Sequence, residues 1–198
     1  LGCKVTGVTK GSVSYQTPDG KDETLECDYC LLSIGRRPNT NGLGLETIGV
    51  YTERGAIVTD ENLRTNVPGV YAIGDVNGKM MLAHTAYREA EVAVNHMLGK
   101  SDEMRYDVIP SVFYTDPEVA SVGLSKEAAE AQAMTVKEVK LPMSYAGRYL
   151  AESEGGKGFI KLVVDTDRNR LVGCHMVGSY ASEIIMTATM MVDTELTP

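Results

Sequence analysis

Residues 70–75 read Val70-Tyr71-Ala72-Ile73-Gly74-Asp75, an apolar run that ends at a glycine and an aspartate. Residues 66–69, Asn-Val-Pro-Gly, form a typical turn sequence, so residues 70–73 are predicted to form a short buried strand. A helix is predicted from about His84 to Leu98 with Gly99 as its C-cap, and its apolar stripe is expected at Tyr87, Ala90, Val94 and Leu98. Strand, Gly-Asp, loop and helix together make a βα unit, a common way of presenting groups to a ligand.

The Gly74-Asp75 pair has the chemistry of a nucleotide contact. A glycine at the end of a strand lets a ligand approach the backbone closely. An aspartate beside it can accept hydrogen bonds from sugar-alcohol hydroxyls. The amides that open the following helix would face partial negative charge on the same ligand. A flavin, with its ribityl chain and its ring carbonyls, fits this pattern, whereas a purely structural turn is the simpler alternative for Gly-Asp alone.

Composition and charge exclude several classes of protein. The 198 residues are 43% hydrophobic and 23% charged, which is the balance of a folded chain. Lys plus Arg number 19 against 27 Asp plus Glu, a net charge of −8, and no basic run marks a nucleic-acid partner. No apolar stretch approaches the roughly 20 residues of a membrane span. The chain starts at Leu1 without a leader sequence, and we expect this start to be a cut inside a longer protein.

Four cysteines are too few for a fold built on disulfides, which favours a reducing, cytoplasmic location. Cys27 and Cys30 form a Cys-x-x-Cys in a segment that resembles a strand, so their sulfurs should point to opposite faces and serve as core-filling thiols. No metal site is predicted, because the histidines and carboxylates lack the spacing of metal ligands.

The remaining elements indicate a small meander at the start of the chain and an α+β domain from about residue 109 onward. Strands are predicted at 3–8, 12–17, 29–34, 56–59, 111–114, 136–141, 159–164 and 171–177, with a turn at 17–20 and a hairpin at 165–169. Ser125 is expected to cap a helix that reaches about residue 133, and a final helix should start near Ser179 or Ser182.

Six runs of the sequence occur in the order found in one enzyme family. The runs are 34–39, 65–75, 81–84, 109–123, 157–161 and 181–185. With these motifs the chain resembles the C-terminal part of a pyridine nucleotide–disulfide oxidoreductase, and within that family it is most similar to the dihydrolipoamide dehydrogenases.

The resemblance implies an α+β architecture in three parts. Residues 1–46 would be the end of a NAD-binding domain, residues 47–108 a central FAD-contacting segment, and residues 109–198 an antiparallel-sheet-plus-helices interface domain that dimerises. It also implies that the parent protein is an FAD- and NAD-dependent homodimer that works with 2-oxo acid dehydrogenase complexes.

The resemblance also assigns roles to single residues. Asp75 would hold the ribityl or pyrophosphate part of FAD, and Gly74 would allow its approach. The backbone amides of Leu82, Ala83 and His84 would face the flavin ring. Contacts to the nicotinamide dinucleotide would come from Gly35, Arg36, Met81 and Val112.

Two parts of the family's machinery are missing from these residues. No cysteine pair has the spacing of the redox-active disulfide, and no histidine precedes a proline as in the acid–base dyad. We therefore expect no catalytic residue in this chain and no turnover by it alone. Three alternatives remain: a dimerisation module only, a piece of a glutathione reductase, or a piece of a mercuric reductase.

Overall fold

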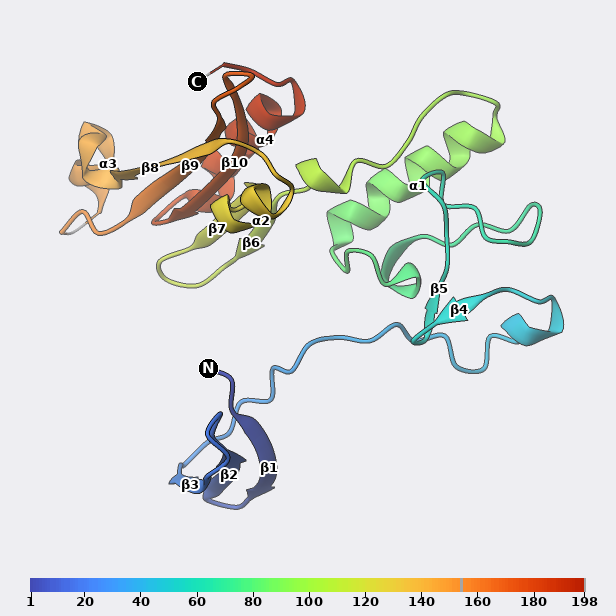
Figure 1. Cartoon of the computed structure of the whole chain (residues 1–198), viewed down its shortest axis with the longest axis horizontal. Coiled ribbons are helices and arrows are strands. Elements are labelled where there is room, and N and C mark those ends of the chain that lie inside the picture. The colour runs from blue at the N-terminus through green and yellow to red at the C-terminus, as the bar shows by residue number, and fades with distance from the viewer. Residues whose placement is uncertain (154, 198) are drawn as a thin grey trace. The chain divides into compact units, whose positions relative to one another are not determined.

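The computed structural model describes residues 1–153 and 155–197, and they divide into two compact units, 1–36 and 37–198 (Figure 1). The first unit is an antiparallel meander of β1 (Lys4–Thr9), β2 (Ser12–Gln16) and β3 (Asp22–Glu26). Its first two strands and its turn at 17–20 are confirmed, because the Gly20 amide donates to the Thr17 carbonyl (2.9 Å). The sequence reasoning missed β3.

The predicted strand at 29–34 is wrong, because this segment has no regular secondary structure. Leu31, Leu32 and Ile34 are 90%, 76% and 87% exposed, and no neighbouring strand takes up their backbone hydrogen bonds. An apolar run forms a strand only where a neighbouring strand can pair with its backbone amides and carbonyls. The prediction that Cys27 and Cys30 are core-filling thiols on a strand fails for the same reason, since Cys30 is exposed and Cys27 is only half-buried beyond β3.

The second unit begins with loops and short elements. They are η1 (Leu45–Thr47), β4 (Thr52–Glu53), β5 (Ala56–Ile57), η2 (Gly74–Asn77), α1 (Ala83–Met97) and η3 (Tyr106–Val108). The predicted strand at 56–59 shrinks to two residues, and the one at 70–73 to a single bridge between Tyr71 and Arg64. The residues on either side of the turn at 66–69 do pair, since the Ala72 amide donates to the Leu63 carbonyl (3.0 Å). The paired stretch is too short to count as a strand.

Helix α1 confirms the predicted helix to within one residue at each end, and Gly99 follows it with a φ of +73°. Its predicted apolar stripe is wrong. Tyr87, Val94 and Leu98 are exposed, whereas the buried face consists of Thr85, Glu89, Val92 and Ala93. The side chains that α1 buries are thus partly polar, and a search for apolar periodicity could not find them.

Residues from 109 onward confirm the predicted α+β fold. Five antiparallel strands lie in the order β6-β7-β10-β9-β8 (Figure 1). Their bounds are Ser111–Phe113 for β6, Val119–Gly123 for β7, Val136–Pro142 for β8, Phe159–Asp165 for β9 and Arg170–Val177 for β10. The helices are α2 (Lys126–Ala131), η4 (Met143–Tyr145), α3 (Gly147–Glu152) and α4 (Ala181–Asp193).

The main core of this part lies between α4 and the central strands β7 and β10. Ile185 and Ala188 of α4 pack with Val122, Cys174 and Met176 of the sheet. Helix α2 covers a smaller cluster around Val163 and Val172. Ser125 caps α2 as predicted, because its hydroxyl accepts from the Ala128 amide (3.2 Å). β7 and α3 were missed by the sequence reasoning.

Candidate functional site

The Gly74-Asp75 pair lies where the chain turns from an extended segment into η2. Ile73 is extended (φ −123°, ψ 157°), and Gly74 has a φ of +73°, a conformation that other residues adopt only with strain. A Cβ on Gly74 would stand 3.4 Å from the Cβ of Ala86 in α1. Gly74 is buried, but Asp75 is exposed, and its carboxylate has no hydrogen-bond partner among the described residues. The carboxylate is therefore free to take a ligand.

A second carboxylate, Glu89 of α1, lies beneath this turn and is completely buried. It accepts hydrogen bonds from the Gly74 amide (2.5 Å), the Asn77 side-chain amide (2.9 Å) and the Tyr106 hydroxyl (2.7 Å). Burial and the hydrogen bond to Glu89 raise the pKa of Tyr106 well above its usual value, so the phenol stays a donor. The sequence reasoning missed Glu89, whose only signal is its place on the buried face of α1.

The start of α1 has free backbone donors. No side chain caps it, and its first internal hydrogen bond is the one that the Ala86 amide gives to Leu82 (3.1 Å). The amides of Ala83, His84 and Thr85 have no partner among residues 1–153 and 155–197, and neither does the fully buried Thr85 hydroxyl. The Leu82 amide donates to the Met80 carbonyl (2.9 Å). That the amides of Leu82, Ala83 and His84 face a flavin ring stays a prediction, and those of Ala83 and His84 are the unpaired ones.

The side chain of His84 fixes this helix start to the third part of the chain. Its Nε2 donates to the Pro110 carbonyl (2.7 Å), directly before β6, the strand that carries Val112. Val112 and Met81 are both half-buried. The structure thus gathers Gly74, Asp75 and the start of α1, and it ties them to the segment that leads to Val112.

Gly35 and Arg36 end the first unit, and both are exposed. Their proposed contact with a dinucleotide stays a prediction. The motif that they begin continues into the second unit, where Pro38 packs near Gly78 and the Thr40 hydroxyl donates to the Gly55 carbonyl (2.7 Å). Residues 38–40 therefore lie beside the turn between β4 and β5 and beside Gly78, which follows η2.

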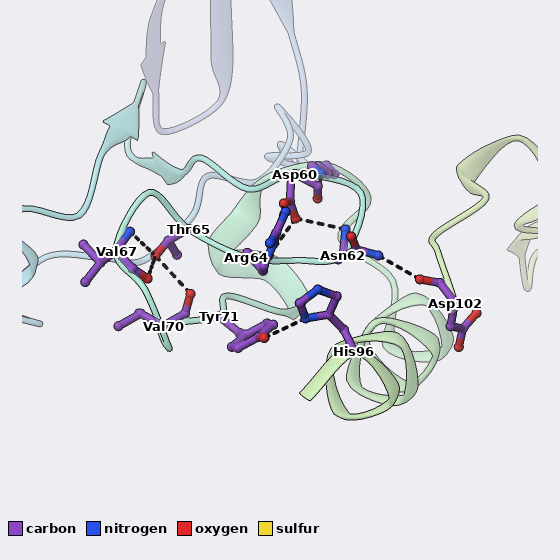
Figure 2. A network of polar contacts seen from close by, with 10 residues as sticks. Asp60, Asn62, Arg64, Thr65, Val67, Val70, Tyr71, His96 and Asp102 are labelled. Carbon is purple, nitrogen blue, oxygen red and sulfur yellow. Dashed lines mark hydrogen bonds and ion pairs between the residues drawn. The ribbon is translucent and has the colours of Figure 1, made fainter. Parts of the chain in front are cut away.

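Side chains hold the segment before Gly74 in place, since regular strands do not. Figure 2 shows the Arg64 guanidinium hydrogen-bonded to the Asp60 carboxylate (2.7 Å). It also shows the hydrogen bond between the Tyr71 hydroxyl and Nδ1 of His96 (2.8 Å), near the end of α1. Burial tends to raise the pKa of Asp60, but the hydrogen bonds from Arg64 outweigh it and lower that pKa. Asn62 extends the network to the Asp102 carbonyl (2.8 Å).

Other chemistry is sparse in the described chain. All four cysteines are free, and burial raises the pKa of the Cys174 thiol to about 11. Within residues 1–153 and 155–197, no three His, Cys, Asp or Glu side chains are grouped so that they could hold a metal ion. No helix of that part has the length and apolar character to cross a membrane.

Comparison with known sequences identifies both halves of the chain. Residues 1–90 match the pyridine nucleotide-disulphide oxidoreductase family, and residues 109–198 match its dimerisation domain. Dihydrolipoyl dehydrogenase from Chlamydia muridarum is 44% identical over 173 residues, which are 87% of this chain and 37% of that protein. Dihydrolipoyl dehydrogenase 3 from Pseudomonas aeruginosa is 39% identical over 98% of this chain and 42% of its own length. The chain thus spans about two fifths of these relatives.

Solved structures agree with this match. LpdA from Mycobacterium tuberculosis superposes with a TM-score of 0.80 and 29% identity, over 98% of this chain and 42% of LpdA. The flavoprotein disulfide reductase RclA from Escherichia coli gives a TM-score of 0.78 with 25% identity, over 96% of this chain and 43% of RclA. With both family matches and the fold in agreement, the chain belongs to the pyridine nucleotide-disulphide oxidoreductase family.

Proposed function

We propose that this chain is the flavin-contacting and dimerisation part of an FAD-dependent oxidoreductase that passes electrons from dihydrolipoamide to NAD⁺. The observation that carries the proposal is the exposed, unpartnered carboxylate of Asp75 beside the uncapped start of α1. The names of the similar proteins, dihydrolipoyl dehydrogenases and a flavoprotein disulfide reductase, support it.

The residues at this turn suit FAD. Asp75 can accept hydrogen bonds from ribityl hydroxyls, and Gly74 leaves the backbone open to close approach. The unpaired amides of Ala83 and His84, which lie at the exposed start of α1, can donate to the electron-rich edge of the ring. When bound, FAD supplies the two-electron chemistry that links a dithiol to a nicotinamide. The residues of this chain bind the cofactor, orient it and stabilise its negative charge.

The nicotinamide dinucleotide is proposed to contact Gly35 and Arg36, with Met81 and Val112 near the nicotinamide. Arg36 is exposed and offers a guanidinium for a phosphate, whereas Met81 and Val112 offer apolar surface. The proposed domains are 1–46 for NAD binding, 47–108 for FAD contact and 109–198 for dimerisation. We propose a homodimer that serves 2-oxo acid dehydrogenase complexes in the cytoplasm, and the four free thiols agree with a reducing compartment.

The 198-residue chain should not turn over by itself. Its cysteines at 3, 27, 30 and 174 include no closely spaced pair at the flavin turn, and none of its three histidines precedes a proline. It therefore contains neither the dithiol that would hand electrons to FAD nor the paired acid–base that would move the proton. A dimerisation module without catalysis is the second candidate, and the match of residues 109–198 to a dimerisation domain favours it.

The test compares the longer protein that contains this chain with the 198-residue chain, each supplied with NAD⁺ and dihydrolipoamide. We expect NADH from the longer protein only. The longer protein is also assayed with glutathione disulfide and with Hg²⁺ as electron acceptors from NADPH. If either acceptor is reduced faster than dihydrolipoamide is oxidised, or if the 198-residue chain produces NADH, the proposal is wrong.

A further inference from the structure

The buried carboxylate of Glu89 joins its own helix, α1, to two other segments, η2 and η3. Its donors are the first residue of η2, the last residue of η2 and the first residue of η3: Gly74, Asn77 and Tyr106. Each bond is 2.9 Å or shorter. An ionised carboxylate is the acceptor that three such donors need, since it offers two oxygens with several lone pairs.

This arrangement is specific to the conformation of the turn. The Gly74 amide reaches Glu89 while the residue holds its φ of +73°, and the next side chain, Asp75, is exposed. Because Glu89 belongs to the rigid helix α1, its bond to the amide fixes the backbone from which Asp75 projects. A buried polar network in which every member is satisfied holds one conformation in this way.

Burial of a carboxylate is not needed for helix packing alone. Apolar residues of similar volume often stabilise a fold as well as a buried charge does, and Val92 and Ala93 on the same face of α1 show that apolar packing is available there. The carboxylate is needed because the turn presents unpaired donors to α1. Removing it would leave the Gly74 amide buried without an acceptor.

We propose that Glu89 is a positioning residue of the flavin site, which acts through the Gly74 amide to hold Asp75 in the orientation that receives the ribityl chain. The inference rests on the proposed function, because it presumes that Asp75 binds FAD. Glu89 itself is completely buried beneath the turn, so it acts through the Gly74 amide and not by direct contact. The same carboxylate binds the Tyr106 hydroxyl, so it also joins the turn to the segment that leads into residues 109–198.

The first experiment uses the longer protein with its FAD. Oε1 of Glu89 accepts from Asn77 and Tyr106, whereas Oε2 accepts only from the Gly74 amide. Glu89→Gln keeps the size of the side chain, and when its remaining oxygen takes the place of Oε1 the bond to the Gly74 amide is lost. The control is Val92→Ala, which removes buried volume from the same face of α1, in a cluster that contains no residue of η2. The readouts are the dissociation constant of FAD, the visible circular dichroism of the bound flavin and the midpoint of thermal unfolding.

We expect Glu89→Gln to weaken FAD binding about tenfold and to change the flavin dichroism, as the loss of a hydrogen bond to a charged group would. Val92→Ala should lower the unfolding midpoint at least as much, with the FAD dissociation constant within about twofold of the original. If both variants weaken FAD only in proportion to their loss of stability, or if Glu89→Gln binds FAD normally, the proposal is overturned while the proposed function stands. If the unmodified longer protein binds no FAD, the proposed function itself is wrong.

A second experiment needs no flavin. Amide hydrogen exchange in the 198-residue chain should show the Gly74 amide exchanging about tenfold faster in Glu89→Gln than in the unmodified chain. Val92→Ala should accelerate exchange along α1 without singling out Gly74. An unchanged rate at Gly74 in Glu89→Gln would overturn the positioning role whatever the flavin results are.

Discussion

Gly74 and Gly69 both have a left-handed backbone, but only Gly74 has a side chain, that of Ala86, close to its Cα. The φ angles are +73° and +79°, but a Cβ on Gly74 would stand 3.4 Å from the Ala86 Cβ, whereas one on Gly69 would meet no atom within 4 Å. We predict that Gly69→Ala lowers the free energy of unfolding by about 1 kcal/mol through backbone strain alone. Gly74→Ala should lower it by slightly more, because the added methyl group would stand close to the Ala86 methyl group.

Urea unfolding of the two variants of the 198-residue chain measures this difference. Equal losses of stability for Gly74→Ala and Gly69→Ala would show that Ala86 does not press on the turn.

At the level of single residues, the sequence predicts Asp75 as a candidate binding residue, but it gives no sign of Glu89, which supports the turn from below. Asp75 follows an apolar run and a glycine, so its exposure at a turn could be predicted. Glu89 stands in a helix among other charged residues, and only the fold shows that it lies on the buried face. The free amides of Ala83, His84 and Thr85 depend on where α1 begins, which sequence patterns predict only to within a few residues.

At the level of helices and strands, the predicted strands that formed are those with pairing strands and packing helices among the described residues. The strands β8, β9 and β10 formed where predicted because they pair with one another and pack on helices. The apolar runs at 29–34 and 70–73 have the composition of strands, but among the described residues no strand pairs with 29–34, and 70–73 forms a single bridge. Sequence patterns show that a segment can form a strand, and only its neighbours determine whether it does.

The hydrogen bonds between α1 and Asp102, in the segment that follows the helix, are predicted to make the stability of the fold depend on pH. The Asp102 carboxylate accepts hydrogen bonds from both Nη atoms of Arg88 and from the Asn95 side-chain amide (2.8 Å). These hydrogen bonds lower the pKa of Asp102 from 3.8 to about 2. Since this pKa is lower in the folded state than in the unfolded state, the stabilisation is fully present above about pH 4. It is lost as the pH falls through about 2.

Asp102→Asn should therefore lower the thermal unfolding midpoint at pH 7, and the difference from the unmodified chain should shrink between pH 4 and pH 2. Glu103→Gln changes an exposed neighbour of Asp102 and serves as the control. A difference that stays constant down to pH 2 would contradict the assignment of the shift to Arg88 and Asn95.

At the scale of the whole molecule, residues 109–198 should associate with a second copy. Met186 and Met190 of α4 are 53% and 65% exposed on a helix whose other face packs against the sheet. We predict that sedimentation equilibrium finds dimers of the 198-residue chain and that Met190→Glu shifts them to monomers, because a charge would then be buried in the contact. Tyr87→Glu, at an exposed position of α1, is the control and should leave the dimer intact.

A monomer at every concentration would contradict association through this domain. Dimers that persist in Met190→Glu would place the contact elsewhere than α4.

The affinity for FAD shows whether the carboxylate of Asp75 holds this cofactor. The measurement is the dissociation constant of FAD from the longer protein that contains this chain, compared between Asp75→Asn and the exposed control Glu61→Gln. Because Asp75→Asn loses a charged acceptor, its dissociation constant for FAD should rise at least about tenfold. Glu61→Gln should bind FAD as the unmodified protein does. An Asp75→Asn protein that holds FAD with unchanged affinity would contradict the account.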